Sequence, residues 1–203
     1  WKGTLLELEK FISDINSVHS AIKFDINHSK ASISFLDTTV TINQDKKVKT
    51  SLYEKPTDRH NYLHYKSYHP SSTKKSLPYS QALRIKRICS TKEDYLASTK
   101  SMKEQFKRRG YDEIEIEKAI LKASQKDRTE LLHPVSKQEK KTPLTFVTTF
   151  NKSLPKFKTI LENNWTMLAI NDKIAEKFKD KPMISYKRNP NLKQLIGSYK
   201  IIN

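Results

Sequence analysis

Residues 55–90 contain the side chains whose chemistry is most informative. Between Lys55 and Thr91 the sequence has eight Lys or Arg residues and a single acidic residue, Asp58, with tyrosines interleaved among them. Cationic groups bind phosphates and flat rings stack on bases or sugars, a usual combination in proteins that bind nucleic acid. Tyrosines in a core and lysines in solvent would give the same composition. The pattern therefore favours a polyanionic partner and predicts no readout of base sequence.

Several side chains of this stretch are candidate contacts to nucleic acid. Arg84 and Arg87 are three residues apart on a predicted helix and therefore share a face. The other candidates come from the loop that precedes this helix. Together the candidates in this stretch are Lys55, Arg59, His60, Tyr62, Tyr65, Lys66, His69, Arg84 and Arg87.

Patterns typical of catalysis or metal binding do not occur. No closely spaced pair of aspartates follows an apolar strand, as the two-metal polymerases require. The aspartates of residues 1–54 stand alone and are expected to cap helices or flank strands. His60, His64 and His69 have loose spacing and no accompanying carboxylate pattern. We therefore predict no catalytic residue, no metal ligand and no cofactor for this chain, and we expect these histidines to make polar contacts with phosphate or backbone.

The formal net charge of +17 is unevenly distributed. Residues 1–54 hold 7 Lys/Arg and 7 Asp/Glu, residues 55–140 hold 20 and 11, and residues 141–203 hold 12 and 4. A neutral beginning followed by a basic body predicts a localised surface for a polyanion, with an affinity that depends on salt.

Composition also excludes several classes of protein. Only three glycines occur, which argues against glycine-rich phosphate loops. Cys89 is the only cysteine, so no disulfide can form within the chain, and we expect it to be a small core residue. The sequence has no secretory signal pattern and no apolar run near eighteen residues. These features predict an intracellular protein without a membrane partner. With nucleic acid as the expected partner, the expected location is the nucleus.

The first quarter of the chain is predicted to mix helix and strand. Apolar spacing of three and four predicts an amphipathic helix over residues 4–18. Alternation predicts a strand over residues 22–26, and dense β-branched residues predict another over residues 32–42. A slip in the alternation at Phe35-Leu36 indicates a bulge or a kink. Residues 47–54 are predicted to form the return strand.

The rest of the chain is predicted to be mainly helical. Pro78 suits the first turn of one helix, and Gly110 suits the C-terminal cap of the next. The fold class is α+β. The expected later elements are helices over 77–90, 91–109 and 112–126, a strand over 144–150, helices over 155–165 and 171–179, a strand over 183–187 and a helical turn over 191–196. The predicted divisions are 1–54, a basic loop and trihelical unit over 55–126, a polar linker over 127–142, and a basic C-terminal domain over 143–203.

The sequence also resembles a known family across nearly its whole length. The most specific parts are KPTDRHNYLHYKSYHP (55–70) and SLPYSQALRIKRICS (76–90). They resemble the segment that follows the reverse transcriptase core of Penelope-like retroelements, often catalogued as an animal helix-turn-helix domain. ISFLDTTV (33–40) is similar to the strand pair beyond the catalytic aspartates, and PMISYKRNPNLKQL (182–195) to the C-terminal basic motif, which adds Lys187 and Arg188 to the candidate contacts.

The resemblance implies a part of a larger enzyme. Trp1 would fall just after the strand that bears the catalytic aspartates, so the Mg²⁺-dependent polymerase site would belong to residues upstream. A GIY-YIG nuclease would be a possible downstream neighbour. The implied partner is an RNA/DNA template–primer duplex. Residues 1–54 would be the end of the palm with a hairpin resembling a primer grip, and residues 55–126 the thumb.

Two other functions remain open at this stage. The chain could be a helix-turn-helix DNA-binding regulator or adaptor, or an inactive remnant of a retroelement. Paired aspartates in upstream sequence would favour the enzyme.

Overall fold

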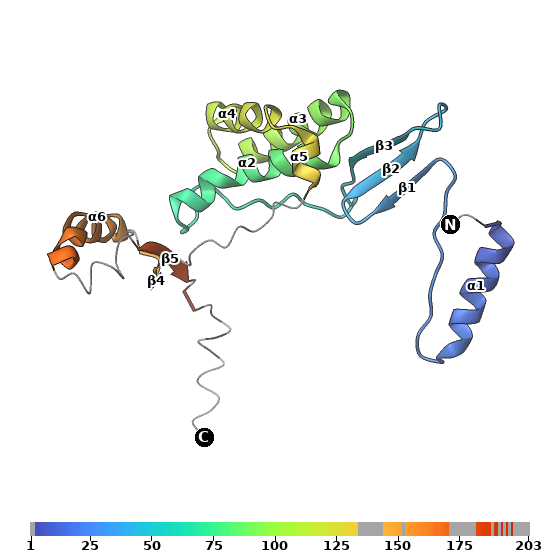
Figure 1. The fold of residues 1–203 in the computed structure, drawn as a ribbon, viewed down its shortest axis with the longest axis horizontal. Coiled ribbons are helices and arrows are strands. Elements are labelled where there is room, and N and C mark those ends of the chain that lie inside the picture. Colours follow the sequence, from blue (N-terminus) through green and yellow to red (C-terminus); the bar gives the residue numbers. More distant parts are fainter. Residues whose placement is uncertain are drawn as a thin grey trace, which may run out of the picture. The chain divides into compact units, whose positions relative to one another are not determined.

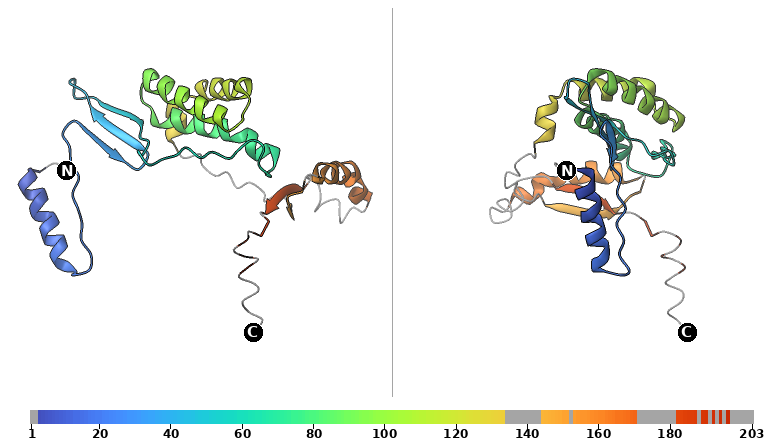
Figure 2. Two further views of the ribbon diagram at one scale, coloured as in Figure 1. Left: turned by 180° about the vertical axis from the view of Figure 1, so that it is seen from behind. Right: turned by 90° about the vertical axis from the view of Figure 1, so that its right-hand side faces the viewer.

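The computed structural model describes residues 3–133, 144–151, 153–170, 182–187 and 189–190, together with Leu192, Gln194 and Ile196. The chain is α+β, as predicted, and divides into two units (Figures 1 and 2). Unit 1 comprises Trp1–Lys66 and Ser76–Leu132, and unit 2 comprises Ser67–Lys75 and His133–Asn203. The elements are α1 (Leu5–Val18), β1 (Ser32–Phe35), β2 (Thr38–Ile42), β3 (Val48–Leu52), α2 (Ser71–Ile88), α3 (Lys92–Arg108), α4 (Glu113–Ser124), α5 (Arg128–Leu132), β4 (Thr145–Thr149), α6 (Leu154–Asn164), the 3₁₀ helix η1 (Trp165–Ile170) and β5 (Met183–Lys187).

Helix α1 confirms the first predicted helix. A capping box closes its N-terminus, because the Glu7 N–H donates to Thr4 Oγ1 and the Thr4 N–H donates to the Glu7 carboxylate. The strand predicted over residues 22–26 is wrong. The Phe24 backbone is bonded to a side chain, since its N–H donates to Asn16 Oδ1 and its carbonyl accepts from Asn16 Nδ2. These bonds to a side chain take the place of a strand ladder at Phe24.

Strands β1, β2 and β3 form an antiparallel sheet in that order. Phe35 pairs with Thr38, so Leu36 and Asp37 are the two residues of a tight turn. The prediction of a bulge or kink within a single strand is therefore wrong, because the slip in the apolar pattern marks a chain reversal. Leu36 has φ 55°, a left-handed conformation uncommon for a branched residue.

Helix α2 begins six residues earlier than predicted, at Ser71, so Pro78 is a buried residue of the helix interior. The first turn follows Pro70, whose carbonyl accepts from the Lys74 N–H at 3.3 Å. Lys74 Nζ also donates to the carbonyl of Ser67. Pro78 has no N–H, so the carbonyl of Lys74 lacks its usual helical hydrogen-bond donor. The proline was interpreted as the first residue of the helix, although it lies in the helix interior.

Helices α3 and α4 begin and end as their caps predict. Thr91 and Asp112 accept from the N–H groups of Asp94 and Glu115 at the two N-termini. Gly110, with φ 80°, ends α3. The N–H of Gly110 donates to the carbonyl of Lys107, and that of Tyr111 to the carbonyl of Phe106, which is the Schellman arrangement. The Phe106 and Tyr111 rings pack edge to face beside it, with centroids 4.9 Å apart.

The core of unit 1 lies between α2, α3 and α4. Phe106, Met102 and Ile116 are its largest fully buried side chains. It receives Ala82 and Ile85 from α2 and Cys89 from directly after that helix, which confirms Cys89 as a core residue. Leu83 packs against this core while partly exposed, and Ile88 is half-buried. The Tyr95 hydroxyl donates to the Ile120 carbonyl and joins α3 to α4.

Backbone bonds attach the sheet to the helices of unit 1. The Ser90 N–H donates to the carbonyl of Thr50 in β3, and the Thr50 N–H donates back to Ser90 Oγ, both at 2.9 Å. Arg128 in α5 donates to the Arg87 carbonyl and to Thr50 Oγ1. Helix α5 therefore occupies the first part of the segment predicted as a polar linker.

Unit 2 contains a parallel pair of strands, β4 and β5, which confirms both predicted strands. Helix α6 confirms the predicted helix and continues into η1. The helix predicted over residues 171–179 lies outside the described residues. In the last predicted helical turn, Leu192, Gln194 and Ile196 are helical. In the described part of the chain, no helix combines the length and apolar character needed to span a membrane.

Candidate nucleic-acid interface

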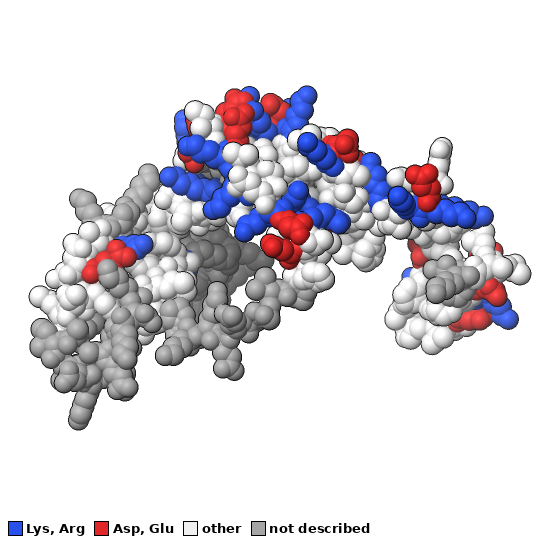
Figure 3. Space-filling view, turned by 45° about the horizontal axis from the view of Figure 1, so that its top comes forward, with Lys and Arg blue, Asp and Glu red and all other residues white. Residues whose placement is uncertain are grey.

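The helical part of unit 1 carries cationic side chains with acidic groups standing among them (Figure 3). Some of these cations are paired with carboxylates of the same unit. Arg84 pairs with Asp37, Lys49 with Asp94, and Lys103 with Glu113 and Glu117. Paired cations are largely neutralised, so the cations available to a polyanion are fewer than the composition indicates.

Arg84, a predicted phosphate contact, is held by the β1–β2 turn. Its Nε and Nη2 both donate to Asp37 Oδ2 at 2.9 Å, and both side chains are 43% exposed. This arrangement fixes the turn of the hairpin against α2. Arg87 lies nearly one turn further along the same helix and is exposed, so it is the more available of the two predicted arginines.

A second ion-pair network joins α3 to α4. Lys103 Nζ lies 2.7 Å from Glu113 and 2.6 Å from Glu117. Hydrogen bonds with Glu113 and then Glu117 raise the pKa of Lys103, so it stays cationic. Lys107 also pairs with Glu113, at 3.2 Å. The cations in the middle of α3 thus bind its neighbouring helix, whereas Arg108 at its end is exposed.

Three arginines line one small cavity in unit 1. The cavity has a volume of about 230 Å³ and is lined by Arg59, His60, Asn61, Gln105, Arg108 and Arg109. None of these residues is acidic. Arg109 donates from Nε to the Tyr62 carbonyl at 2.7 Å and from Nη2 to Asn61 Oδ1 at 3.1 Å. Neutral oxygens orient this guanidinium without cancelling its charge.

The walls of this arginine cavity contain two further polar groups. Gln105 is buried, and its Oε1 has no hydrogen-bond partner among the described residues, while its Nε2 donates to Ser101 Oγ. His60 has φ 46°, and its ring lies 3.4 Å from Glu54 and 3.5 Å from Asp58. His60 therefore lies between the arginines of the cavity and the carboxylates of Glu54 and Asp58.

Two tyrosines of the predicted loop, Tyr62 and Tyr65, pack inward in unit 1. Tyr62 stacks on Phe106 with centroids 4.3 Å apart and an interplanar angle of 6°, and burial raises the pKa of Tyr62. Tyr65 packs edge to face with Tyr111 at 5.1 Å. These rings attach the loop to the core of unit 1. Tyr62 and Tyr65 therefore have the core-packing role that the sequence left open as the alternative to base stacking.

The predicted contacts are distributed over both units. In unit 1, Lys55, Arg59 and Lys66 are exposed, whereas His69 and Lys187 are exposed in unit 2. Arg188 lies outside the described residues. The structure adds Arg108 and Arg109 to the group around Arg59. Their signal in the sequence is a run of three basic residues directly before the helix-ending glycine.

The comparisons with known proteins agree with this geometry. Residues 61–121 match the family model of the animal helix-turn-helix domain, a domain found in Penelope-like elements. The matched range covers the end of the basic loop, α2, α3 and most of α4. Searches of curated proteins and of solved structures return no match. A helix-turn-helix domain of this kind indicates nucleic-acid binding.

Proposed function

We propose that this chain is the nucleic-acid-binding part of a Penelope-like reverse transcriptase, which holds a template–primer duplex through its phosphates. The aspartates and Mg²⁺ of polymerisation would belong to residues outside this sequence, and the chain itself would need no cofactor. The observation that carries the proposal is the arginine cavity beside the matched helix-turn-helix domain.

The cavity supports phosphate binding because its charges need a counterion. Arg59, Arg108 and Arg109 bring three positive charges to one small space without an acidic lining residue. Like charges in contact repel, and a phosphate oxygen is the acceptor that a guanidinium fits best. A backbone phosphate would neutralise them together. Such contacts position a duplex without reading its sequence.

The charge on α4 limits where a duplex can lie. The first turn of this helix exposes Glu113 and Glu115, and Glu117 follows one turn later, also exposed. These carboxylates are paired with Lys103, Lys107 and Lys118, so this face offers a phosphate backbone little net attraction. The cavity and Arg87 lie on other elements of unit 1 and remain available to phosphates.

A sequence-specific DNA-binding regulator is the second candidate, and the helix-turn-helix match favours it equally. Such a protein would insert a recognition helix into the major groove and place polar side chains on base edges. On α3, however, Lys103 and Lys107 are engaged with Glu113. This engagement supports the backbone-binding function over the regulator.

Titration of the chain with duplexes at two salt concentrations tests the proposal. Four exposed cations, Lys55, Arg59, Arg87 and Arg108, would give a salt slope of about −3.6. Affinity should then fall about 150-fold between about 50 and 200 mM salt. Scrambled duplexes should bind equally well. A preference of about a thousandfold for one sequence would favour the regulator.

A further inference from the structure

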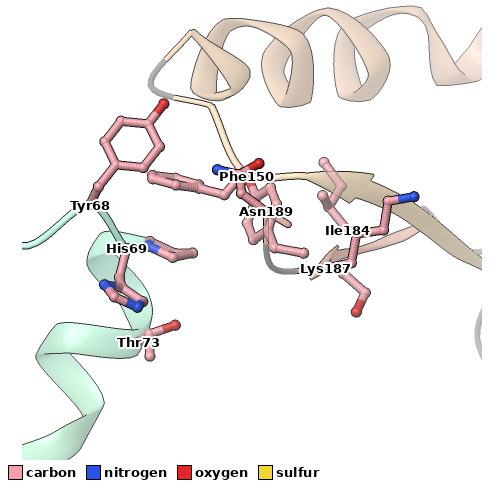
Figure 4. A pocket seen from close by; sticks show the side chains of 10 residues that line it. Tyr68, His69, Thr73, Phe150, Ile184, Lys187 and Asn189 are labelled. Carbon is pink, nitrogen blue, oxygen red and sulfur yellow. The ribbon is translucent and has the colours of Figure 1, made fainter. Parts of the chain in front are cut away.

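Unit 2 contains a larger pocket with aromatic walls, shown in Figure 4. Its volume is about 520 Å³, within the range of about 300–1,000 Å³ that is usual for small-molecule sites. One side comes from the segment that leads into α2, with Tyr68, His69 and Thr73. The other side comes from the region of β4 and β5, with Phe150, Ile184, Tyr186, Lys187 and Asn189 among its residues.

Three rings form a continuous wall of this pocket. Phe150 packs edge to face against Tyr68, with centroids 5.1 Å apart, and against Tyr186, with centroids 5.5 Å apart. Each ring therefore supports the next in a fixed orientation. Tyr68 remains 49% exposed, although it is anchored to Phe150. An exposed ring held in place loses little conformational freedom when a flat ligand stacks on it.

The polar groups of the pocket select for a negative ligand. Lys187 places an ammonium group at the strand side of the pocket, directed away from Tyr68 (Figure 4), while Thr73, Ser185 and Asn189 can donate and accept hydrogen bonds. His69 is exposed, with Nδ1 3.1 Å from Ser67 Oγ. None of the lining residues is acidic. A ligand that combines a flat ring, hydrogen-bonding edges and an anion matches this lining.

We propose that the aromatic pocket of unit 2 binds an unpaired nucleotide of single-stranded nucleic acid. The base stacks on the Tyr68 side of the wall, Asn189 and Ser185 meet its polar edge, and Lys187 meets the adjoining phosphate. The inference deepens the proposed function, since it adds a single-strand site on unit 2 to the duplex-binding surface proposed on unit 1. It does not require that the duplex bind through the arginine cavity.

Stacking distinguishes this site from a merely basic surface. A phosphate-only contact would bind a strand with or without bases, whereas an aromatic wall gains affinity only when a base is present. Base–aromatic stacking is sequence-tolerant, because every base has a π face. The pocket should therefore accept all four bases.

The test uses the full chain and a single strand of about eight nucleotides, which lies within the usual site size for a single-strand-binding fold. The strand carries 2-aminopurine at its centre, whose fluorescence falls on stacking. A matched strand of the same length and charge carries abasic residues instead of bases. The base-bearing strand should bind about 5- to 100-fold more tightly, with quenched fluorescence.

Two variants probe the wall and the cation. Tyr68→Ala should remove most of the quenching and most of the preference for bases, and Lys187→Gln should weaken both strands alike. Matched controls are Phe35→Ala, which removes a ring that is 71% exposed in unit 1, and Lys126→Gln on an exposed lysine. Neither control should change the preference for bases, because neither residue lines the pocket.

The affinity for a blunt-ended duplex tests the proposed function independently of the nucleotide site. Tyr68→Ala should leave the affinity for a blunt duplex unchanged. Equal affinity of the wild-type chain for base-bearing and abasic strands would overturn the nucleotide site, as would equal quenching by Tyr68→Ala and Phe35→Ala. Absence of duplex binding with retained quenching would instead overturn the duplex function and leave the nucleotide site standing.

Discussion

Reversing the charge of two arginines in the cavity gives the sharpest test of how unit 1 holds a duplex. We consider the double variant Arg59→Glu with Arg108→Glu. Both residues are exposed, so each meets phosphate in a water-like dielectric, where two unit charges about 4 Å apart interact by about 1 kcal/mol. Reversal removes this attraction and adds a repulsion of equal size, which gives about 2 kcal/mol for each residue.

The double variant should therefore lose about 4 kcal/mol of binding free energy, or about a thousandfold in affinity. The assay is fluorescence anisotropy with a blunt duplex at low salt, where screening is weakest. Removing two phosphate contacts should also make the salt slope shallower by about 1.8. Circular dichroism should be unchanged, because among the described residues neither guanidinium forms an ion pair with a carboxylate.

A matched control distinguishes the effect of the cavity arginines from the effect of a lower net charge. Lys118→Glu with Lys126→Glu changes the net charge by the same amount on exposed residues at α4 and just beyond it. It should weaken duplex binding far less, because neither lysine lines the cavity. Equal losses for the two double variants would refute a localised site and leave only a diffuse basic surface.

Three further results are expected. A double-mutant cycle with Asp37→Ala and Arg84→Ala, followed by chemical denaturation, measures the coupling energy of this ion pair. The coupling energy should be between about 0 and 1 kcal/mol, because both side chains are 43% exposed. A much larger value would contradict this expectation. Gly110→Ala should lower the free energy of unfolding by about 1–2 kcal/mol, because φ is 80° at this position. The nearest side-chain atom to an added Cβ is 3.6 Å away, so the cost comes from backbone strain and not from a steric clash. An unchanged midpoint of urea denaturation would refute this prediction. Hydrogen bonds to Lys103 lower the pKa of Glu113 from 4.5, so the pair stabilises the fold above that pH and the stabilisation is lost as pH falls through the depressed pKa. Lys103→Gln should therefore lower the melting temperature near neutral pH, with a difference from wild type that shrinks below pH 4.5, and a difference independent of pH would oppose this account.

Local signals predicted the helices well. Thr91, Asp112 and Gly110 mark helix boundaries because caps and left-handed turns depend on residues within one turn of each other. Pro78 shows where local reasoning fails. A proline near an apolar run resembles a helix start, yet the preceding seven residues continue the helix on its N-terminal side.

Contacts distant in sequence could not be predicted in the same way. The arginine cavity joins Arg59 to Arg108 through the packing of the basic loop on α3, and no periodicity links these positions. The Asp37–Arg84 pair likewise joins residues 47 apart. Tyr62 was predicted as a nucleic-acid contact because a tyrosine among basic residues fits base stacking as well as core packing. Only the fold shows that its ring stacks on Phe106.

The way the basic loop is fastened has a consequence for folding kinetics. The part of the basic loop in unit 1, residues 53–66, contains no helix or strand, and bonds to the end of α3 hold it in place. The Arg109 side chain donates to the Tyr62 carbonyl, and the Arg109 carbonyl accepts from the Tyr65 N–H. Because these contacts close a span of more than 40 residues, they form only after the end of α3 exists. The loop should thus be the last part of unit 1 to gain protection from hydrogen exchange during refolding, and the first to lose it when α3 frays.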